Sequence, residues 1–315
     1  MDHSGHGMMT DLPPFTLGRG LAWSADPFFL VACLLGLALY GWGVLRLTRR
    51  GDKWLVGRTV SFVVGVLSVA LMMCTKLNDY GMVMFSVHMV QHMIISMVSP
   101  ILLLLGAPIT LALRALPPAG RGRKGPRELL LMLLHSRYMR IVTHPAFTIP
   151  LFIASLYALY FTPLFDFLMG SSAGHIAMMV HFLAVGVVFF WPIMGVDPGP
   201  HRPGYLMRML ELFAGMPFHA FFGIALMMAS APMVGTFENP PASLGIDALS
   251  DQNAAGGIAW AFSEVPSVLV LLALLFQWYA SEERRARRSD RAAERDGDRE
   301  LAEYNAYLAS LNARG

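Results

Sequence analysis

Charged residues are scarce in this chain. Asp, Glu, Lys and Arg make up 14% of its 315 residues, whereas soluble domains carry about a quarter. Hydrophobic residues make up 55%. So few charges cannot cover the surface of a soluble protein of this length, and we therefore expect an integral membrane protein.

Cysteine is also scarce, and several enzyme motifs are missing. Cys33 and Cys74 are the only two cysteines, which excludes a disulfide framework. Both lie in apolar segments, and we interpret Cys33 as a small buried hydrophobic residue. The sequence contains no Gly-rich phosphate-binding loop and no nucleophile elbow. These absences argue against a nucleotide-dependent enzyme or a hydrolase, and nothing indicates a nucleic-acid partner.

Long apolar segments dominate what the sequence does contain. Each is long enough to cross a bilayer, which takes roughly 20 helical residues. They lie at about 28–47, 57–77, 82–105, 145–165, 174–194, 207–230 and 257–280. We therefore predict an all-α bundle of seven transmembrane helices over residues 28–280, preceded by a short arm (1–27) and followed by a charged tail (281–315).

The basic residues predict the orientation of this bundle. With seven crossings, 22 of the 24 Lys and Arg residues fall on one side, and only Arg19 and Lys76 fall on the other. Cytoplasmic loops carry the excess of Lys and Arg in membrane proteins. We therefore expect the N-terminus outside and the C-terminus in the cytoplasm. The tail, with charges of alternating sign, is typical of a solvated helix.

Proline marks irregularities near the third segment. Pro100 and Pro108 are expected to interrupt it, because proline cannot donate a backbone hydrogen bond. Residues 128–140 of the following connection show an amphipathic pattern. We expect them to form one helix on the inner membrane surface, in contact with lipid.

The third segment carries the most informative motif, HMVQHM at 88–93. His88 and His92 are four residues apart, so they share one helix face about 6 Å apart along the axis. Met84 would continue this stripe one turn earlier. Ionisable residues inside a membrane helix are costly and indicate function by default. The alternative is that each histidine only hydrogen-bonds to a neighbouring helix.

Matched depth predicts which other ligands could join these histidines. The fifth segment carries His175, Met178 and His181, and His181 falls at about the depth of His88. His219 in the sixth segment matches His92. The second segment ends on the outer side near Cys74. Equal depth is necessary for these side chains to converge, although it does not ensure that they do.

Methionine and histidine are enriched toward the predicted outer side. Fifteen of 22 methionines and six of ten histidines lie in the outer half or outside, whereas core-filling methionines should favour neither side. Thioether and imidazole ligands select Cu(I) over harder cations. The arm also holds His3, His6, Met8 and Met9, a tract that suggests metal binding but equally fits a tail with no such role.

HMVQHM at 88–93, followed by LGAPITLALRALP at 105–117, resembles the CtaG-type assembly factors of cytochrome c oxidase, which are seven-helix bacterial membrane proteins linked to caa3-type oxidases. WP at 191–192 and DRELAEYNAYLASLN at 298–312 agree with this resemblance. It implies a multi-pass protein of the bacterial plasma membrane that acts with haem–copper oxidase subunits. It supports His88 and His92 most directly.

Three functional hypotheses follow. The first is an assembly factor without enzymatic activity that holds Cu(I) on His88, His92 and His181, with Met178 or Met84, and releases it to an oxidase subunit. The second is a redox protein that binds b-type haem through His88 with His181, or His92 with His219. The third is a copper transporter, for which the predicted inner half offers few polar residues.

Overall fold

The computed structural model describes residues 12–120, 123–200, 203–296 and 299–313. Throughout these ranges the regular elements are helices, and the only β-type pairing is an isolated bridge between Trp23 and Thr75. The chain divides into two compact units, Met1–Val268 and Leu269–Gly315. The division into 1–27, 28–280 and 281–315 that the sequence suggests stays a prediction.

Six helical stretches among the described residues are long and apolar enough to cross a membrane. They are α2 (Pro27–Arg49), α3 (Val56–Met73), the stretch Phe85–Ala115, α12 (Ser172–Met194), α13 (Tyr205–Met228) and α14 (Ala248–Asp296). The remaining predicted segment forms α10 (Pro145–Tyr160), whose 16 residues would reach only about 24 Å. The count of seven spans and the sidedness of the termini therefore stay predictions.

The stretch Phe85–Ala115 is not one regular helix. It consists of α5 (Phe85–Met93), a π-helical turn η1 (Ile94–Val98), α6 (Ser99–Leu105) and α7 (Pro108–Ala115). Pro108 follows a true break, because Ala107 adopts a left-handed conformation with φ of 51°. The expected interruption at Pro100 is replaced by the π turn, after which the helix continues. Such turns rearrange the hydrogen-bond ladder locally and are frequent at functional sites.

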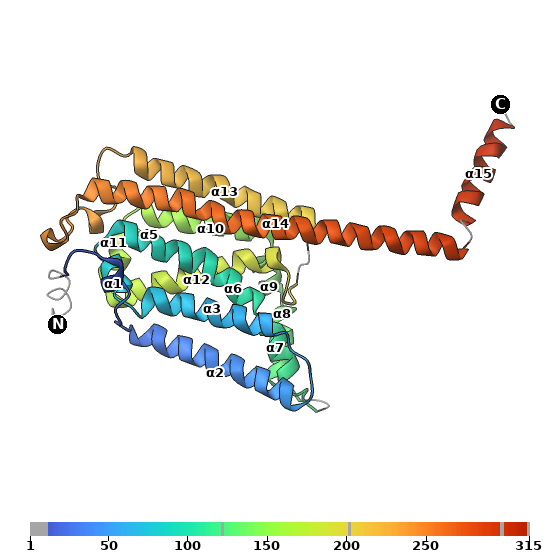
Figure 1. Ribbon diagram of the computed structural model, residues 1–315, viewed down its shortest axis with the longest axis horizontal. Helices are drawn as coiled ribbons and strands as arrows, with labels where there is room; N and C mark the ends of the chain where they lie inside the picture. The colour runs from blue at the N-terminus through green and yellow to red at the C-terminus, as the bar shows by residue number, and fades with distance from the viewer. Residues whose placement is uncertain (1–11, 121–122, 201–202, 297–298, 314–315) are drawn as a thin grey trace. The chain divides into compact units, whose positions relative to one another are not determined.

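The centre of the first unit is formed by α6, which packs against both α3 and α12 (Figure 1). The crossing of α12 over η1 depends on Gly186, because a Cβ there would collide with the carbonyl of Ser96. Glycine thus allows two backbones in the interior to approach closely.

Short elements cover the end of the first unit at which the described chain begins. These are α1 (Leu17–Gly20), α4 (Leu77–Gly81), α11 (Leu164–Met169), η2 (Gly235–Phe237) and η3 (Ala242–Leu244). The Tyr80 hydroxyl donates to the Pro13 carbonyl at 2.9 Å, and the Lys76 amide donates to the Ala22 carbonyl at 2.9 Å. The histidines and methionines of the arm at positions 3–9 lie outside the described residues.

The predicted single helix over 128–140 is wrong in detail. The structure has α8 (Pro126–Leu134) and α9 (Arg137–Val142), separated at His135–Ser136. Ser136 begins α9 by accepting a hydrogen bond from the Met139 amide at 3.1 Å, as N-cap serines do.

The charged tail is helical, as predicted. It comprises the end of α14 and α15 (Arg299–Asn312), and almost all of its described side chains are exposed. Two ion pairs within α14, Arg285 with Glu282 and Arg287 with Glu283, follow the spacing of neighbouring helix turns.

Candidate metal site among buried histidines

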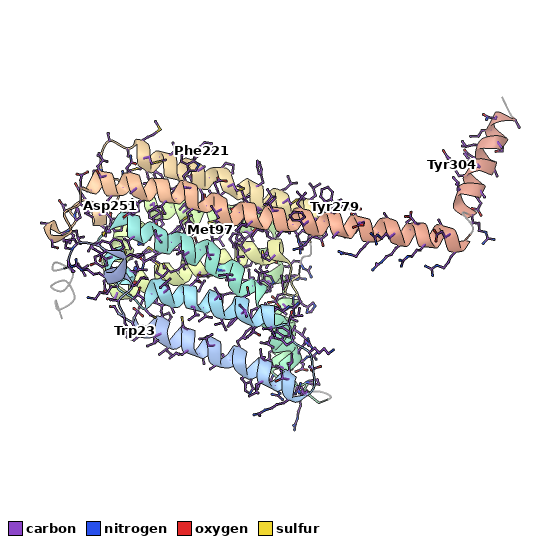
Figure 2. All side chains as sticks on the ribbon, in the orientation of Figure 1. Trp23, Met97, Phe221, Asp251, Tyr279 and Tyr304 are labelled. Carbon is purple, nitrogen blue, oxygen red and sulfur yellow. The ribbon has the colours of Figure 1, made fainter. Side chains whose placement is uncertain are left out.

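The histidines of HMVQHM are positioned by a helix that a distant residue caps. The Asp251 carboxylate, on α14, accepts hydrogen bonds from the Phe85 and Ser86 amides at 2.6 and 3.3 Å; Figure 2 labels Asp251 near the start of α14. α5 therefore starts at Phe85. Met84 precedes it in an extended conformation, so the expectation that Met84 continues the helical stripe is wrong. Its side chain is nevertheless buried.

His88 is fully buried and held by a tyrosine. Its Nε2 lies 3.0 Å from the hydroxyl of Tyr160, the last residue of α10. Its ring lies toward the Gly81 carbonyl, but Nδ1 makes no hydrogen bond of ordinary geometry. Phe165 and Phe237 pack around the imidazole with centroid distances of 5.0 and 5.7 Å. His88 thus has one engaged nitrogen and one that is free.

His92 is buried to 3% exposure, and neither of its ring nitrogens has a hydrogen-bond partner. An unsatisfied buried polar atom costs about 1–3 kcal/mol, so this ring is an unusual feature of the interior. His219 of α13, also 3% exposed, lies with its ring centroid 6.5 Å from that of His92. Metal–imidazole bonds are about 2.0 Å long. Two imidazoles that bind one ion from opposite sides would therefore have their centroids roughly 6–6.5 Å apart.

His175 and Met178 lie on the buried face of α12. The Nε2 of His175 has no partner, and this ring is an electrostatic neighbour of His88. Phe182, on the same face, packs its ring 4.0 Å from that of His92. His175 is thus the histidine of α12 whose charge would be felt by His88, whereas the depth argument had matched His181 with His88.

His181 faces elsewhere, although its depth made it a candidate ligand. It is exposed, and its Nε2 pairs with the Ser155 hydroxyl of α10 at 2.9 Å. It lines an apolar groove of about 420 Å³ between α10 and α12. Its imidazole therefore already has a polar partner on the surface of the bundle.

Cys74 is a buried free thiol directly after α3. Its amide donates to the Ala70 carbonyl at 2.7 Å, and its carbonyl accepts from the Ser24 amide at 3.2 Å. These contacts tie the end of α3 to the segment before α2. Cys33 is also free and buried, which confirms its interpretation as a buried residue.

The described residues contain no group of three or more His, Cys, Asp or Glu side chains arranged to hold a metal ion. A site here would use pairs of imidazoles, with thioethers where they are near. Cu(I) is the cation suited to such soft, neutral ligands. Whether His88, His92, His175, His181, His219, Met84, Met178 and Cys74 bind copper stays a prediction.

Haem fits this arrangement poorly. A macrocycle between His92 and His219 would have to displace aromatic side chains. Phe182 and Tyr160 lie 4.0 and 5.8 Å from the His92 ring, and Phe152 lies 5.0 Å from the His219 ring.

Two residues of the site carry no clear signal in the sequence. Tyr160 lies in an apolar segment like other tyrosines, and Asp251 follows an exposed loop. Only the packing of α10 and α14 against α5 reveals that one engages His88 and the other caps the helix.

A model of the cytochrome c oxidase caa3 assembly factor family matches residues 38–281, which are 244 of the 315 residues. The chain belongs to this family. The resemblance that HMVQHM and LGAP indicated is therefore confirmed. The match is consistent with a membrane-embedded assembly factor.

Several mycobacterial proteins are similar to most of the chain. Uncharacterized proteins of Mycobacterium bovis and Mycobacterium tuberculosis are each 45% identical over 309 residues, covering 96% of this chain. One from Mycobacterium leprae is 44% identical over 306 residues, covering 95%. The chain spans about half the length of these relatives, 46% in each case. No solved structure matches the chain.

Proposed function

We propose that this protein assists cytochrome c oxidase assembly by holding Cu(I) on buried histidines and releasing it to an oxidase subunit docked in the membrane. In this role it is a carrier and not an enzyme. The family membership supports the oxidase as its target. The copper step is our inference from the histidines.

The observation that carries the proposal is His92, a buried imidazole with two unpartnered nitrogens, 6.5 Å from the ring of His219. Bound to a cation, such a nitrogen would gain the partner that it lacks in the metal-free protein. His219 lies toward the Gly215 carbonyl, which could accept the N–H of its second nitrogen, as is common for metal-binding histidines. His88 and His175, each with one free nitrogen, would form a second pair nearby.

The ligand chemistry favours a monovalent soft ion that is released again. Neutral imidazoles bring no charge into the interior, so Cu(I) adds a single positive charge, and a divalent ion would cost more to bury. Two neutral ligands also give moderate affinity. An oxidase subunit with more ligands could then remove the ion.

An anaerobic Cu(I) titration against a chromophoric chelator tests the proposal, with the ultraviolet–visible spectrum recorded beforehand. We expect specific Cu(I) binding that is lost in the His88→Ala, His92→Ala variant. His181→Ala is the matched control, because that histidine is exposed and bonded to Ser155; it should bind copper as the wild type does. Equal binding by all three proteins would refute the site.

The cellular counterpart measures oxidase activity in strains that carry each variant. The double variant should leave the oxidase subunits present but inactive, whereas the His181→Ala strain should keep full activity. Full activity with the double variant would exclude a copper role. A Soret band in the purified protein would instead point to haem, and uptake of copper into sealed vesicles would point to transport.

A further inference from the structure

The LGAP motif creates a groove beside α2. Its break at Ala107 separates α7 from α6. The break is held by the Tyr40 hydroxyl, which donates to the Gly106 carbonyl at 2.8 Å. The Tyr40 ring stacks on Phe62 with a centroid distance of 4.0 Å. The motif thus contributes a fixed change of chain direction that the metal site does not use.

A buried carboxylate fixes the start of α7. Asp197 accepts hydrogen bonds from the amides of Ile109 and Thr110 at 3.1 and 2.8 Å, and from the Thr110 hydroxyl at 2.6 Å. This is the capping that a helix N-terminus needs. With both the break and the cap in place, α7 is held in position beside α2.

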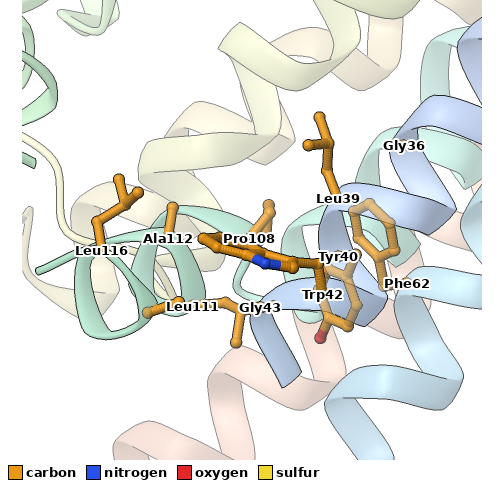
Figure 3. A pocket seen from close by; sticks show the side chains of 11 residues that line it. Gly36, Leu39, Tyr40, Trp42, Gly43, Phe62, Pro108, Leu111, Ala112 and Leu116 are labelled. Atoms are coloured by element: carbon orange, nitrogen blue, oxygen red, sulfur yellow. The ribbon is translucent and has the colours of Figure 1, made fainter. Parts of the chain in front are cut away.

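The groove lies between α2 and α7 and has a volume of about 350 Å³ (Figure 3). Gly36, Leu39 and Trp42 line it from α2, and Leu111 and Ala112 line it from α7. Apolar side chains thus form most of its wall. The Cβ position of Gly36 has no atom within 4 Å, so there is open space against this part of the helix.

Arginines adjoin the groove at the C-terminal end of α2. Arg46, Arg49 and Arg50 line a second hollow of about 390 Å³, and Trp42 borders both hollows. The Arg46 guanidinium lies over the Trp42 ring, 5.1 Å from its centroid. Asp52, the acidic residue that follows in the sequence, pairs with Arg114 at 3.6 Å. Three guanidinium groups therefore line a hollow that meets the apolar groove at Trp42. One of them, Arg50, also donates a hydrogen bond to the Arg114 carbonyl at 3.3 Å.

We infer that this surface binds a phospholipid with an anionic headgroup, whose acyl chain lies in the α2–α7 groove and whose phosphate contacts the arginines. Arginine forms strong hydrogen bonds with phosphate oxygens, and basic pockets between membrane helices bind anionic lipids. Charge complementarity favours this ligand over a zwitterionic lipid, whose cationic choline or amine cancels the charge of its phosphate, and over an uncharged transmembrane helix, which would leave the arginines without an anionic partner.

Quenching of Trp42 fluorescence by brominated acyl chains tests the proposal on the full-length protein. The signal of Trp42 is the difference between the wild type and Trp42→Phe. We expect brominated phosphatidylglycerol to quench it at a mole fraction at least tenfold lower than brominated phosphatidylcholine does. Each basic residue near an anionic membrane surface contributes about a fivefold preference, so three arginines allow this ratio.

Two sets of variants separate the headgroup from the chain. Changing Arg46, Arg49 and Arg50 to Gln should abolish the preference for phosphatidylglycerol. Gly36→Phe should fill the groove and weaken quenching by both lipids. Gly41→Phe is its matched control, because Gly41 is also on α2 with open space around its Cβ position but does not line the groove.

The possible outcomes decide the proposal. Equal quenching by both lipids in the wild type would overturn it, and so would a preference that survives the triple Gln change. Quenching that is unchanged in Gly36→Phe would place the acyl chain elsewhere. A co-purified membrane polypeptide that shields Trp42 from both lipids would assign the groove to a partner helix instead. None of these results depends on copper binding, so the two proposals fail independently.

Discussion

Replacing His92 by leucine should stabilise the metal-free protein while it abolishes copper binding. Both nitrogens of His92 are buried without partners, and each such atom costs about 1–3 kcal/mol. Leucine fills a similar volume and keeps an apolar contact with Phe182, whose ring lies 4.0 Å away in the wild type. We therefore expect a net gain of about 2 kcal/mol, which raises the melting temperature by a few degrees.

His88→Leu provides a contrast of smaller effect. It removes the hydrogen-bond partner of the Tyr160 hydroxyl, 3.0 Å away, and leaves that buried group unsatisfied, at a cost of about 1–3 kcal/mol. It also removes the Nδ1 of His88, which makes no hydrogen bond of ordinary geometry, and this offsets a similar amount. The melting temperature of the metal-free protein should therefore stay close to that of the wild type, whereas His92→Leu should raise it.

The assay is thermal unfolding of purified protein in detergent, with a Cu(I) chelator and then with excess Cu(I). A ligand at 100 times its dissociation constant stabilises the folded state by about 2.7 kcal/mol. The wild type should show such a gain, and His92→Leu should show none. If His92→Leu stabilises the metal-free protein no more than His88→Leu does, the reasoning from unpartnered nitrogens is refuted.

Three further predictions concern the scaffold. Asp251→Ala should lower the free energy of unfolding by about 0.5–2 kcal/mol and weaken Cu(I) binding, because it uncaps the helix that carries both motif histidines. Asp247→Ala uncaps only α14 and should leave the Cu(I) affinity unchanged. Equal losses of Cu(I) affinity in the two variants, measured by calorimetry, would contradict this. Backbone N–H groups hold the pKa of Glu128 below its ordinary 4.5. The stabilisation that Glu128 gives the start of α8 is therefore present above about pH 4.5 and is lost as the pH falls through the lower folded-state pKa. Amide hydrogen exchange at the start of α8 should become faster over that pH range, and Glu128→Gln should remove this pH dependence. Gly186→Ala should reduce the yield of folded protein on size-exclusion chromatography, because its Cβ meets a backbone carbonyl, whereas Gly57→Ala, with open space around the Cβ, should not.

Much of the fold follows from the linear pattern. Apolar runs long enough to cross a bilayer place the helices, and the helical tail follows from its charge pattern. Local chemistry also marks the break before Pro108. It does not predict the π turn at Ile94–Val98, because that turn depends on how η1 packs against α12 and α3. α10 likewise ends at Tyr160, before α11 begins at Leu164, a boundary that hydropathy alone does not predict.

The sequence by itself determined that His88 and His92 share one helix face, and it indicated that His181 lies at about the depth of His88 and His219 at about the depth of His92. Depth is a single coordinate along the helix axis, and convergence also requires the right rotation about that axis and the right neighbour. The packing of α12 turns His175 inward and leaves His181 exposed beside Ser155, and the packing of α13 brings His219 near His92. Only the tertiary structure decided these positions, because they depend on contacts between different helices and not on the pattern along one of them.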